Sequence, residues 1–192
     1  MKTIHLTYGA LFICLMAIGA NITVWFPMLA IPIGATSVPL SLQTFFAILA
    51  GFLLGRRLGL LTMLVYIFVG IVGIPVFAGL KAGPMMLFLP TGGFIISFAL
   101  VTYVVGLLNE KNQKDTLLRY TYISFIGLII NYGFGITYMY LSMKLVLHVD
   151  ITYIAAFISM VPFFIKDFSL AILAAYFVKR TERLALKNTV PR

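Results

Sequence analysis

Two ionisable side chains, Lys166 and Asp167, lie within a long apolar stretch near the C-terminus of the chain. A charge near the centre of a transmembrane helix costs roughly 2.5–3.5 kcal/mol on insertion scales, so such residues usually have a function. Asp167 is predicted to bind a polar ligand or, because it lies near the start of its helix, to interact with the helix dipole. Lys166 is predicted to bind the same ligand or to reach the membrane surface. Adjacent helical residues point about 100° apart, so we expect the two not to pair simply with each other.

Amide and phenol groups in other apolar stretches are further candidates for a polar site. Gln43 lies in the first turns of the second predicted helix, and Asn131 and Tyr132 lie in the fifth. Such groups can bind a polar ligand, or they can join helices, with measured gains that average about 0.6 kcal/mol. The two histidines, His5 and His148, form no zinc-ligand pair, and no phosphate-binding Walker motif is present. The sequence therefore predicts no enzyme activity, no cofactor and no metal site.

The composition decides which class of protein must position these groups. Of 192 residues, 62% are hydrophobic and 10% are charged, whereas soluble domains carry about 25% charged residues. The chain is therefore predicted to be an integral membrane protein, with one domain over residues 1–192. The net charge of +9 is attributed to cytoplasmic loops, where Lys and Arg gather, and no nucleic-acid partner is predicted.

Apolar runs long enough to cross a bilayer, about 20 residues each, predict an all-α fold with six transmembrane helices. Pro- and Gly-containing residues 31–39 are predicted to form the first turn, and 151–160 a short interfacial helix that ends at Pro162. The predicted spans are residues 6–30, 38–54, 58–73, 91–108, 120–143 and 165–178.

Positive charges are distributed unequally between the two sides that six spans create. One side receives eleven of the 14 Lys and Arg residues, and the other receives only Lys81 and Lys144, with Lys166 at the edge of the sixth span. Because positive loops stay inside, both termini are predicted to be cytoplasmic in the cell membrane. The eleven residues are Lys2, Arg56, Arg57, Lys111, Lys114, Arg119, Lys179, Arg180, Arg183, Lys187 and Arg192.

Residues 73–94 connect two spans on the predicted outer side and are rich in Gly and Pro, yet they remain apolar. Proline interrupts helices, and a membrane cannot satisfy the free backbone groups of an irregular segment. We therefore expect residues 74–90 to fold back onto the protein as a lid or a wall of a cavity, with Phe77 lining it.

Four runs of sequence follow one another in an order that is specific to one family. They are VPLSLQTF at 38–45, LAGFLLG at 49–55, GIPVFAG at 73–79 and PTGGF at 90–94. Together they resemble the BioY family, the biotin-capturing S components of energy-coupling factor (ECF) transporters. The resemblance extends over nearly the whole chain.

The resemblance implies a six-helix S-component bundle with structured outer loops, which binds biotin from the outside and has no enzyme activity. It also implies partners: one transmembrane coupling subunit and two ATPase subunits that supply the energy. A pattern of small residues in the first helix docks such subunits onto the coupling subunit. Ala10 and Cys14 match that pattern, with Cys where Ala is usual; ordinary packing within the chain is the alternative.

The sixth helix departs from the family pattern. Pro162-Phe163 and Asp167 match it, but Lys166 replaces a Gly, and Leu170 stands where the family has a Lys. The resemblance implies that the family's Asp and Lys contact biotin, so only Asp167 carries that role over. Lys166, or Lys81 in a divergent outer loop, is predicted to bind the biotin carboxylate instead.

The sequence thus predicts a biotin-binding subunit of a vitamin uptake transporter. The alternatives are the same scaffold for a biotin precursor or another vitamin, motivated by Leu170, and a membrane interaction protein that binds no small molecule. The predicted substrate-binding residues are Asp167, Lys166, Gln43, Phe77, Lys81, Asn131 and Tyr132.

Overall fold

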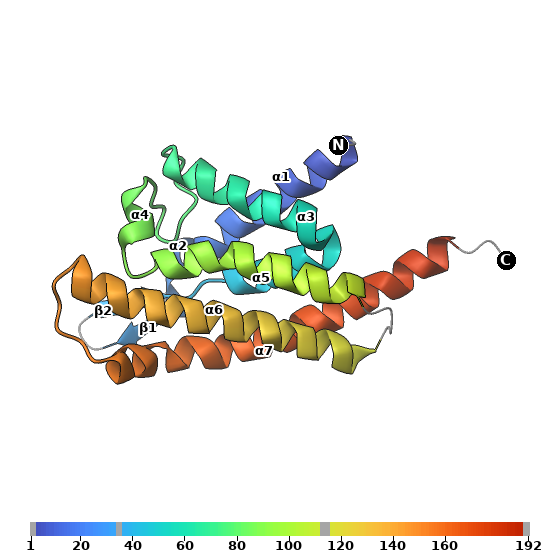
Figure 1. Cartoon of the computed structure of the whole chain (residues 1–192). Coiled ribbons are helices and arrows are strands. Elements are labelled where there is room, and N and C mark those ends of the chain that lie inside the picture. The colour runs from blue at the N-terminus through green and yellow to red at the C-terminus, as the bar shows by residue number, and fades with distance from the viewer. Residues whose placement is uncertain (1–2, 34–35, 112–115, 190–192) are drawn as a thin grey trace.

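The computed structural model describes the backbone of residues 3–33, 36–111 and 116–189, and their side chains apart from 29–39 and 182–189. Within these residues the fold is helical except for one short antiparallel ribbon (Figure 1). The elements are α1 (Thr3–Ala20), α2 (Ile22–Trp25), a 3-10 turn (Pro27–Leu29), β1 (Ala30–Ile33), β2 (Thr36–Pro39), α3 (Gln43–Ile71), α4 (Met85–Phe88), α5 (Gly92–Lys111), α6 (Leu117–Leu145) and α7 (Tyr153–Thr189).

Five of the described helices, α1, α3, α5, α6 and α7, are long and apolar enough to cross a membrane. The helix α3 is two antiparallel helices, because Gly55 has φ +75° and ψ 176°, a backbone conformation that glycine adopts readily. The side chain of Gln43 therefore meets the hydroxyl of Tyr66 across the turn at 2.8 Å. Counted this way, the described residues form six long helical segments, and the predicted all-α membrane fold class is confirmed.

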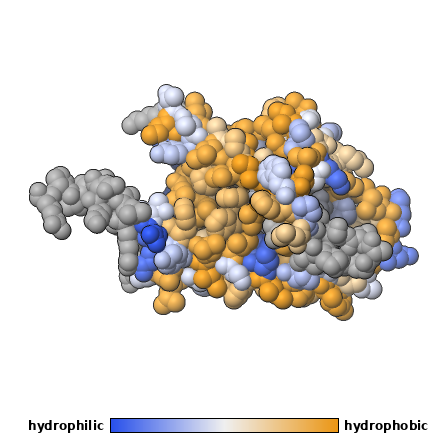
Figure 2. All heavy atoms as spheres, turned by 180° about the vertical axis from the view of Figure 1, so that it is seen from behind, coloured by the Kyte–Doolittle hydropathy of each residue, from blue (hydrophilic) through white to orange (hydrophobic). Residues whose placement is uncertain are grey.

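Close backbone contacts hold the two halves of α3 against α5. A Cβ atom at Gly51 would lie 2.8 Å from the carbonyl oxygen of Thr102, and one at Gly106 would lie 2.4 Å from the backbone nitrogen of Arg56. Arg56 also pairs with Glu110 of α5 at 2.9 Å. The bundle surface is mainly hydrophobic (Figure 2), as expected for a multi-pass protein that faces lipid.

The first span is shorter than predicted. Helix α1 ends at Ala20 rather than at residue 30, because Asn21 bends the chain there and donates its side-chain amide to the carbonyl of Ala17 at 2.9 Å. The predicted turn at 31–39 is part of the β1–β2 ribbon, in which Ile31 pairs with Val38. The next helix consequently begins at Gln43 rather than at residue 38.

The last helix is longer than predicted. Helix α7 runs through Pro162 without a break, so the expectation of a separate interfacial helix over 151–160 was wrong. Proline in a membrane helix is tolerated where neighbouring groups satisfy the freed carbonyl. At 37 residues, α7 measures about 55 Å, and its C-terminal part leaves the bundle (Figure 1).

The two ends of the bundle differ. The start of α1 and the end of α7 lie at one end, and α4 and the ribbon lie at the other (Figure 1). We call the end with α4 and the ribbon the pocket end, since the cavity described next opens there between these segments and the helices.

Candidate functional site

A cavity of about 260 Å³ lies at the pocket end between α3, α5, α6, α7 and the segment 73–91. This volume is at the lower limit of small-molecule sites, which measure roughly 300–1,000 Å³. Its polar lining residues are Ser41, Gln43, Thr44, Lys81, Thr91, Asn131, Tyr132, Lys166 and Asp167. Its apolar lining residues are Phe77, Ala78, Met86, Phe94, Ile95, Phe98, Met139, Met160 and Phe163.

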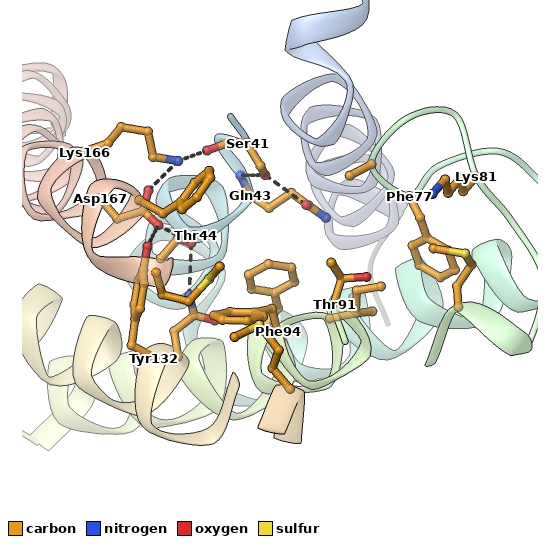
Figure 3. Close-up of a pocket in the computed structure, with 18 residues that line it drawn as sticks. Ser41, Gln43, Thr44, Phe77, Lys81, Thr91, Phe94, Tyr132, Lys166 and Asp167 are labelled. Carbon is orange, nitrogen blue, oxygen red and sulfur yellow. Dashed lines mark hydrogen bonds and ion pairs between the residues drawn. The ribbon is translucent and has the colours of Figure 1, made fainter. Parts of the chain in front are cut away.

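The carboxylate of Asp167 is the best-supported polar group of the cavity (Figure 3). Only 4% of the residue is exposed. Its Oδ2 atom accepts hydrogen bonds from the hydroxyls of Thr44 at 3.0 Å and Tyr132 at 2.8 Å. Its Oδ1 atom accepts no hydrogen bond of good geometry from the described residues, although it lies 2.8 Å from the ammonium of Lys166. One carboxylate oxygen is thus held by two hydroxyls. The other is paired with Lys166 alone, so it retains a lone pair for a further donor.

Lys166 pairs with Asp167, which corrects the expectation that these neighbours do not pair. The flexible four-carbon stem of lysine bridges the angle between the two positions. The ammonium also donates a hydrogen bond to the carbonyl of Ser41. Lys166 therefore compensates the buried carboxylate, and isolated buried charges are costly without such a partner.

A buried chain of hydrogen bonds, which we call a relay, supports the side chain of Asp167. Asn131 donates its side-chain amide to the hydroxyl of Thr44 at 3.1 Å, which leaves the proton of Thr44 for Asp167. Ser97 donates in turn to the side-chain carbonyl of Asn131 at 2.6 Å. Satisfied buried networks of this kind restrict side-chain motion, so the carboxylate is held in one orientation.

Gln43 belongs to a second relay, which joins the cavity to the segment 73–91. Its amide donates to the hydroxyl of Tyr66 at 2.8 Å, and that hydroxyl donates to the carbonyl of Val76 at 3.0 Å. The hydroxyl of Ser41 donates to the side-chain carbonyl of Gln43 at 2.9 Å. These bonds orient the amide that lines the cavity.

Further contacts fix the segment 73–91 to the helices. Asn21, which is 2% exposed, accepts a hydrogen bond from the backbone of Leu80 at 2.7 Å. Tyr138 and Ser142 of α6 donate to the carbonyls of Leu87 and Phe88 at 2.7 and 2.6 Å. Of the two roles predicted for this segment, these contacts favour a wall.

The apolar part of the cavity lies between its two charged ends. Phe77 fills the space above Gly70, where an added Cβ would lie 2.1 Å from the ring. Phe94 packs edge-on against Tyr132 at 5.8 Å between ring centroids. Lys81 lies across the cavity from Lys166 and Asp167 (Figure 3). The arrangement fits an elongated molecule with donors at one end, an apolar middle and an anion at the other end.

The structure brings all seven residues predicted to bind substrate into this one cavity; that they bind a ligand stays a prediction. Sequence reasoning missed Thr44, although its position directly after Gln43 was a usable signal. Ala10 and Cys14 lie exposed on α1 and line no part of the cavity. Among the described residues, no three His, Cys, Asp or Glu residues gather into a potential metal site.

Comparison with known proteins gives one consistent result. A sequence model of the BioY family matches residues 1–187. A Bacillus subtilis protein provisionally named biotin transporter BioYB is 38% identical over 179 residues, which cover 93% of this chain and 88% of that protein. The biotin transporter BioY of Thermotoga maritima is 37% identical over 132 residues, 69% of this chain and 72% of that protein. A crystal structure of the biotin S-component of an ECF-type ABC transporter has a TM-score of 0.70 at 25% identity, covering 95% of each chain.

Proposed function

The chain belongs to the BioY family, and we propose that it is the substrate-binding membrane subunit of a biotin uptake transporter. Biotin has a ureido ring with two N–H donors, an apolar thioether ring and an aliphatic chain that ends in a carboxylate. The cavity offers an acceptor at one end, aromatic and thioether side chains in the middle, and a cation at the other end. The observation that carries the proposal is the buried carboxylate of Asp167, whose Oδ2 atom is held by two hydroxyls and whose Oδ1 atom is paired with Lys166 alone.

In the proposed pose, the ureido ring donates to the Oδ1 atom of Asp167. Hydrogen bonds to a charged acceptor contribute about 1.5–3 kcal/mol, and the hydroxyls of Thr44 and Tyr132 already hold the opposite edge in place. The ring of Tyr132 then packs against the bicyclic ligand. Asn131 acts through Thr44 and serves as a positioning residue.

The carboxylate of biotin is assigned to Lys81 in preference to Lys166. Lys166 already contacts Asp167 and the carbonyl of Ser41, whereas the ion pairs found among the described residues do not include Lys81. Lys81 also lies at the far end of the cavity from Asp167 (Figure 3). Lys166 then serves chiefly to neutralise Asp167.

The proposed orientation follows from the charges. The six predicted spans assign eleven of the 14 Lys and Arg residues to the side of the membrane that carries both termini, and positive segments stay in the cytoplasm. We infer that the pocket faces outward and that both termini are cytoplasmic in the cell membrane. A transmembrane coupling subunit and ATPase subunits would drive release inward, and Ala10 and Cys14 on the exposed face of α1 are the proposed contact with that module.

Equilibrium binding to the purified chain tests the substrate and the role of Asp167 together. Biotin should bind and raise the unfolding temperature, with a stabilisation that grows with the logarithm of its excess over the dissociation constant. Asp167→Asn should weaken binding about 10- to 150-fold, the equivalent of one hydrogen bond to a charge. Asp150→Asn, at an exposed loop position, is the matched control and should leave affinity unchanged.

Competing outcomes have distinct signatures. Tighter binding of dethiobiotin or another vitamin would reassign the substrate while keeping the site. Absence of binding and of stabilisation with every vitamin would favour a membrane interaction protein. Lys81→Ala should weaken biotin but leave the affinity for biotin methyl ester unchanged; an equal loss for both ligands would remove Lys81 from the carboxylate site.

A further inference from the structure

A second cavity of about 310 Å³ lies in the seam between α6 and α7. It opens to the outside of the bundle, since Ile129 and Phe157 in its lining are 65% and 54% exposed. Its side-chain hydroxyls already have partners: Tyr132 donates to Asp167, and Tyr153 lies 3.2 Å from the hydroxyl of Thr137. The lining residues are Ile129, Tyr132, Gly133, Ile136, Tyr153, Phe157, Met160, Val161 and Phe164. Such a surface suits a hydrocarbon chain.

Gly133 keeps this hollow open. A glycine inside a helix is less favourable than alanine by about 1 kcal/mol. The other glycines inside the described helices each have a close neighbour where a side chain would be. A Cβ atom at Gly133 would meet no atom within 4 Å. The missing side chain therefore leaves room in the hollow instead of permitting a close contact between helices.

A row of side chains leads from the hollow towards the pocket end along one face of α6. Gly133, Thr137, Tyr140 and Lys144 follow at spacings of three or four residues, which places them on one face of the helix. Tyr140 packs edge-on against Tyr153 at 5.6 Å, and the ammonium of Lys144 lies 5.8 Å from the centre of the Tyr140 ring. Two phenol rings thus lie between the hollow and the ammonium of Lys144.

The length of this path matches one leaflet of a bilayer. Helix α6 has 29 residues, so it measures about 43 Å, close to the roughly 40–45 Å of a bilayer with its headgroups. Ile129 then lies near the middle of the membrane. Lys144 lies about 22 Å above Ile129 along the helix, which is the depth of the phosphate layer, and Tyr140 and Tyr153 lie where interfacial aromatic residues gather.

We propose that the α6–α7 seam is a binding site for one phospholipid of the leaflet at the pocket end. One acyl chain fills the hollow beside Gly133, and the lipid phosphate meets the ammonium of Lys144. Tyr132 and Met160 line this hollow and the first cavity alike. The acyl chain therefore packs against the ring whose hydroxyl holds Asp167. The site does not depend on the identity of the ligand in the first cavity.

Native mass spectrometry of the delipidated chain, titrated with dioleoyl phosphatidylglycerol, tests the site. The wild type should form one saturable lipid adduct. Gly133→Leu should abolish it, because the new side chain occupies the hollow and its Cβ atom meets no other atom within 4 Å. Ala155→Leu, which adds bulk at an exposed position of α7 outside the hollow, should retain it. Lys144→Gln should weaken it about fivefold, the contribution expected of one cation near a lipid surface.

Each other result would overturn part or all of the assignment. An adduct that survives Gly133→Leu at full affinity would show that lipid binds elsewhere. An adduct lost in Gly133→Leu but unchanged in Lys144→Gln would remove the phosphate contact. Unchanged lipid binding, combined with loss of coupling-subunit association in Gly133→Leu, would identify the seam as a protein interface. The unfolding temperature of each variant, measured without lipid, verifies that it is folded.

Discussion

Replacing Tyr66 with phenylalanine isolates the role of the relay that joins the first cavity to the segment 73–91. The hydroxyl of Tyr66 accepts from Gln43 at 2.8 Å and donates to Val76 at 3.0 Å. Tyr66→Phe keeps the ring and its edge-on contact with Phe77, but it leaves the amide of Gln43 and the carbonyl of Val76 without that partner. The change therefore removes two hydrogen bonds and little packing.

The magnitude follows from the burial of the two orphaned groups. Gln43 lines the cavity, so water in the empty cavity can replace its lost partner. Val76 is 7% exposed, and an unsatisfied buried carbonyl costs about 1–3 kcal/mol. We expect the ligand-free chain to lose about that much stability, which corresponds to roughly 2–4 °C in unfolding temperature for each kcal/mol.

Hydrogen–deuterium exchange and thermal unfolding together provide the assay. Tyr66→Phe should increase exchange within residues 74–83 and accelerate biotin dissociation, because Phe77 follows directly after the released Val76. Tyr103→Phe, at a partly exposed tyrosine of α5 that does not line the cavity, is the control. If Tyr66→Phe matched this control in stability, exchange and dissociation rate, the segment 73–91 would not be held by the relay, and the wall interpretation would be wrong.

Two further substitutions test the support of the carboxylate and the packing of the bundle. Thr44→Val preserves the shape of the side chain but removes a donor to Asp167 and an acceptor for Asn131. Biotin affinity should therefore fall about 5- to 10-fold, the equivalent of one ordinary hydrogen bond. An unchanged dissociation constant would exclude Thr44 as a positioning residue. Gly106→Ala would place a Cβ atom 2.4 Å from the backbone nitrogen of Arg56. Thermal unfolding should therefore show that the free energy of unfolding falls by about 1–3 kcal/mol from overpacking. Unaltered stability would refute the close α3–α5 contact.

The structure departs from the predicted spans at single residues whose contacts involve parts of the chain that are distant in sequence. The apolar neighbours of Asn21 place it within a predicted span, yet its amide is satisfied by Ala17 and by the backbone of Leu80. Leu80 is 59 residues away in the chain. Pro162 was expected to end a helix, but α7 continues through it, because the surrounding bundle outweighs the local preference.

The sequence by itself determined the membrane class, the helical fold and the family, because long apolar runs, turn residues and ordered motifs are local properties of a chain. The sequence also identified the polar candidate residues, since a charge or an amide in a hydrophobic run is unusual whatever the direction of its side chain. Only the tertiary structure decided that Thr44, Tyr132 and Asp167 meet, that Lys166 turns back onto its neighbour, and that Lys81 lies across the cavity. Those contacts depend on the directions of side chains from helices distant in sequence, and the angle at which two helices pack is set by their whole contact surface rather than by any one segment.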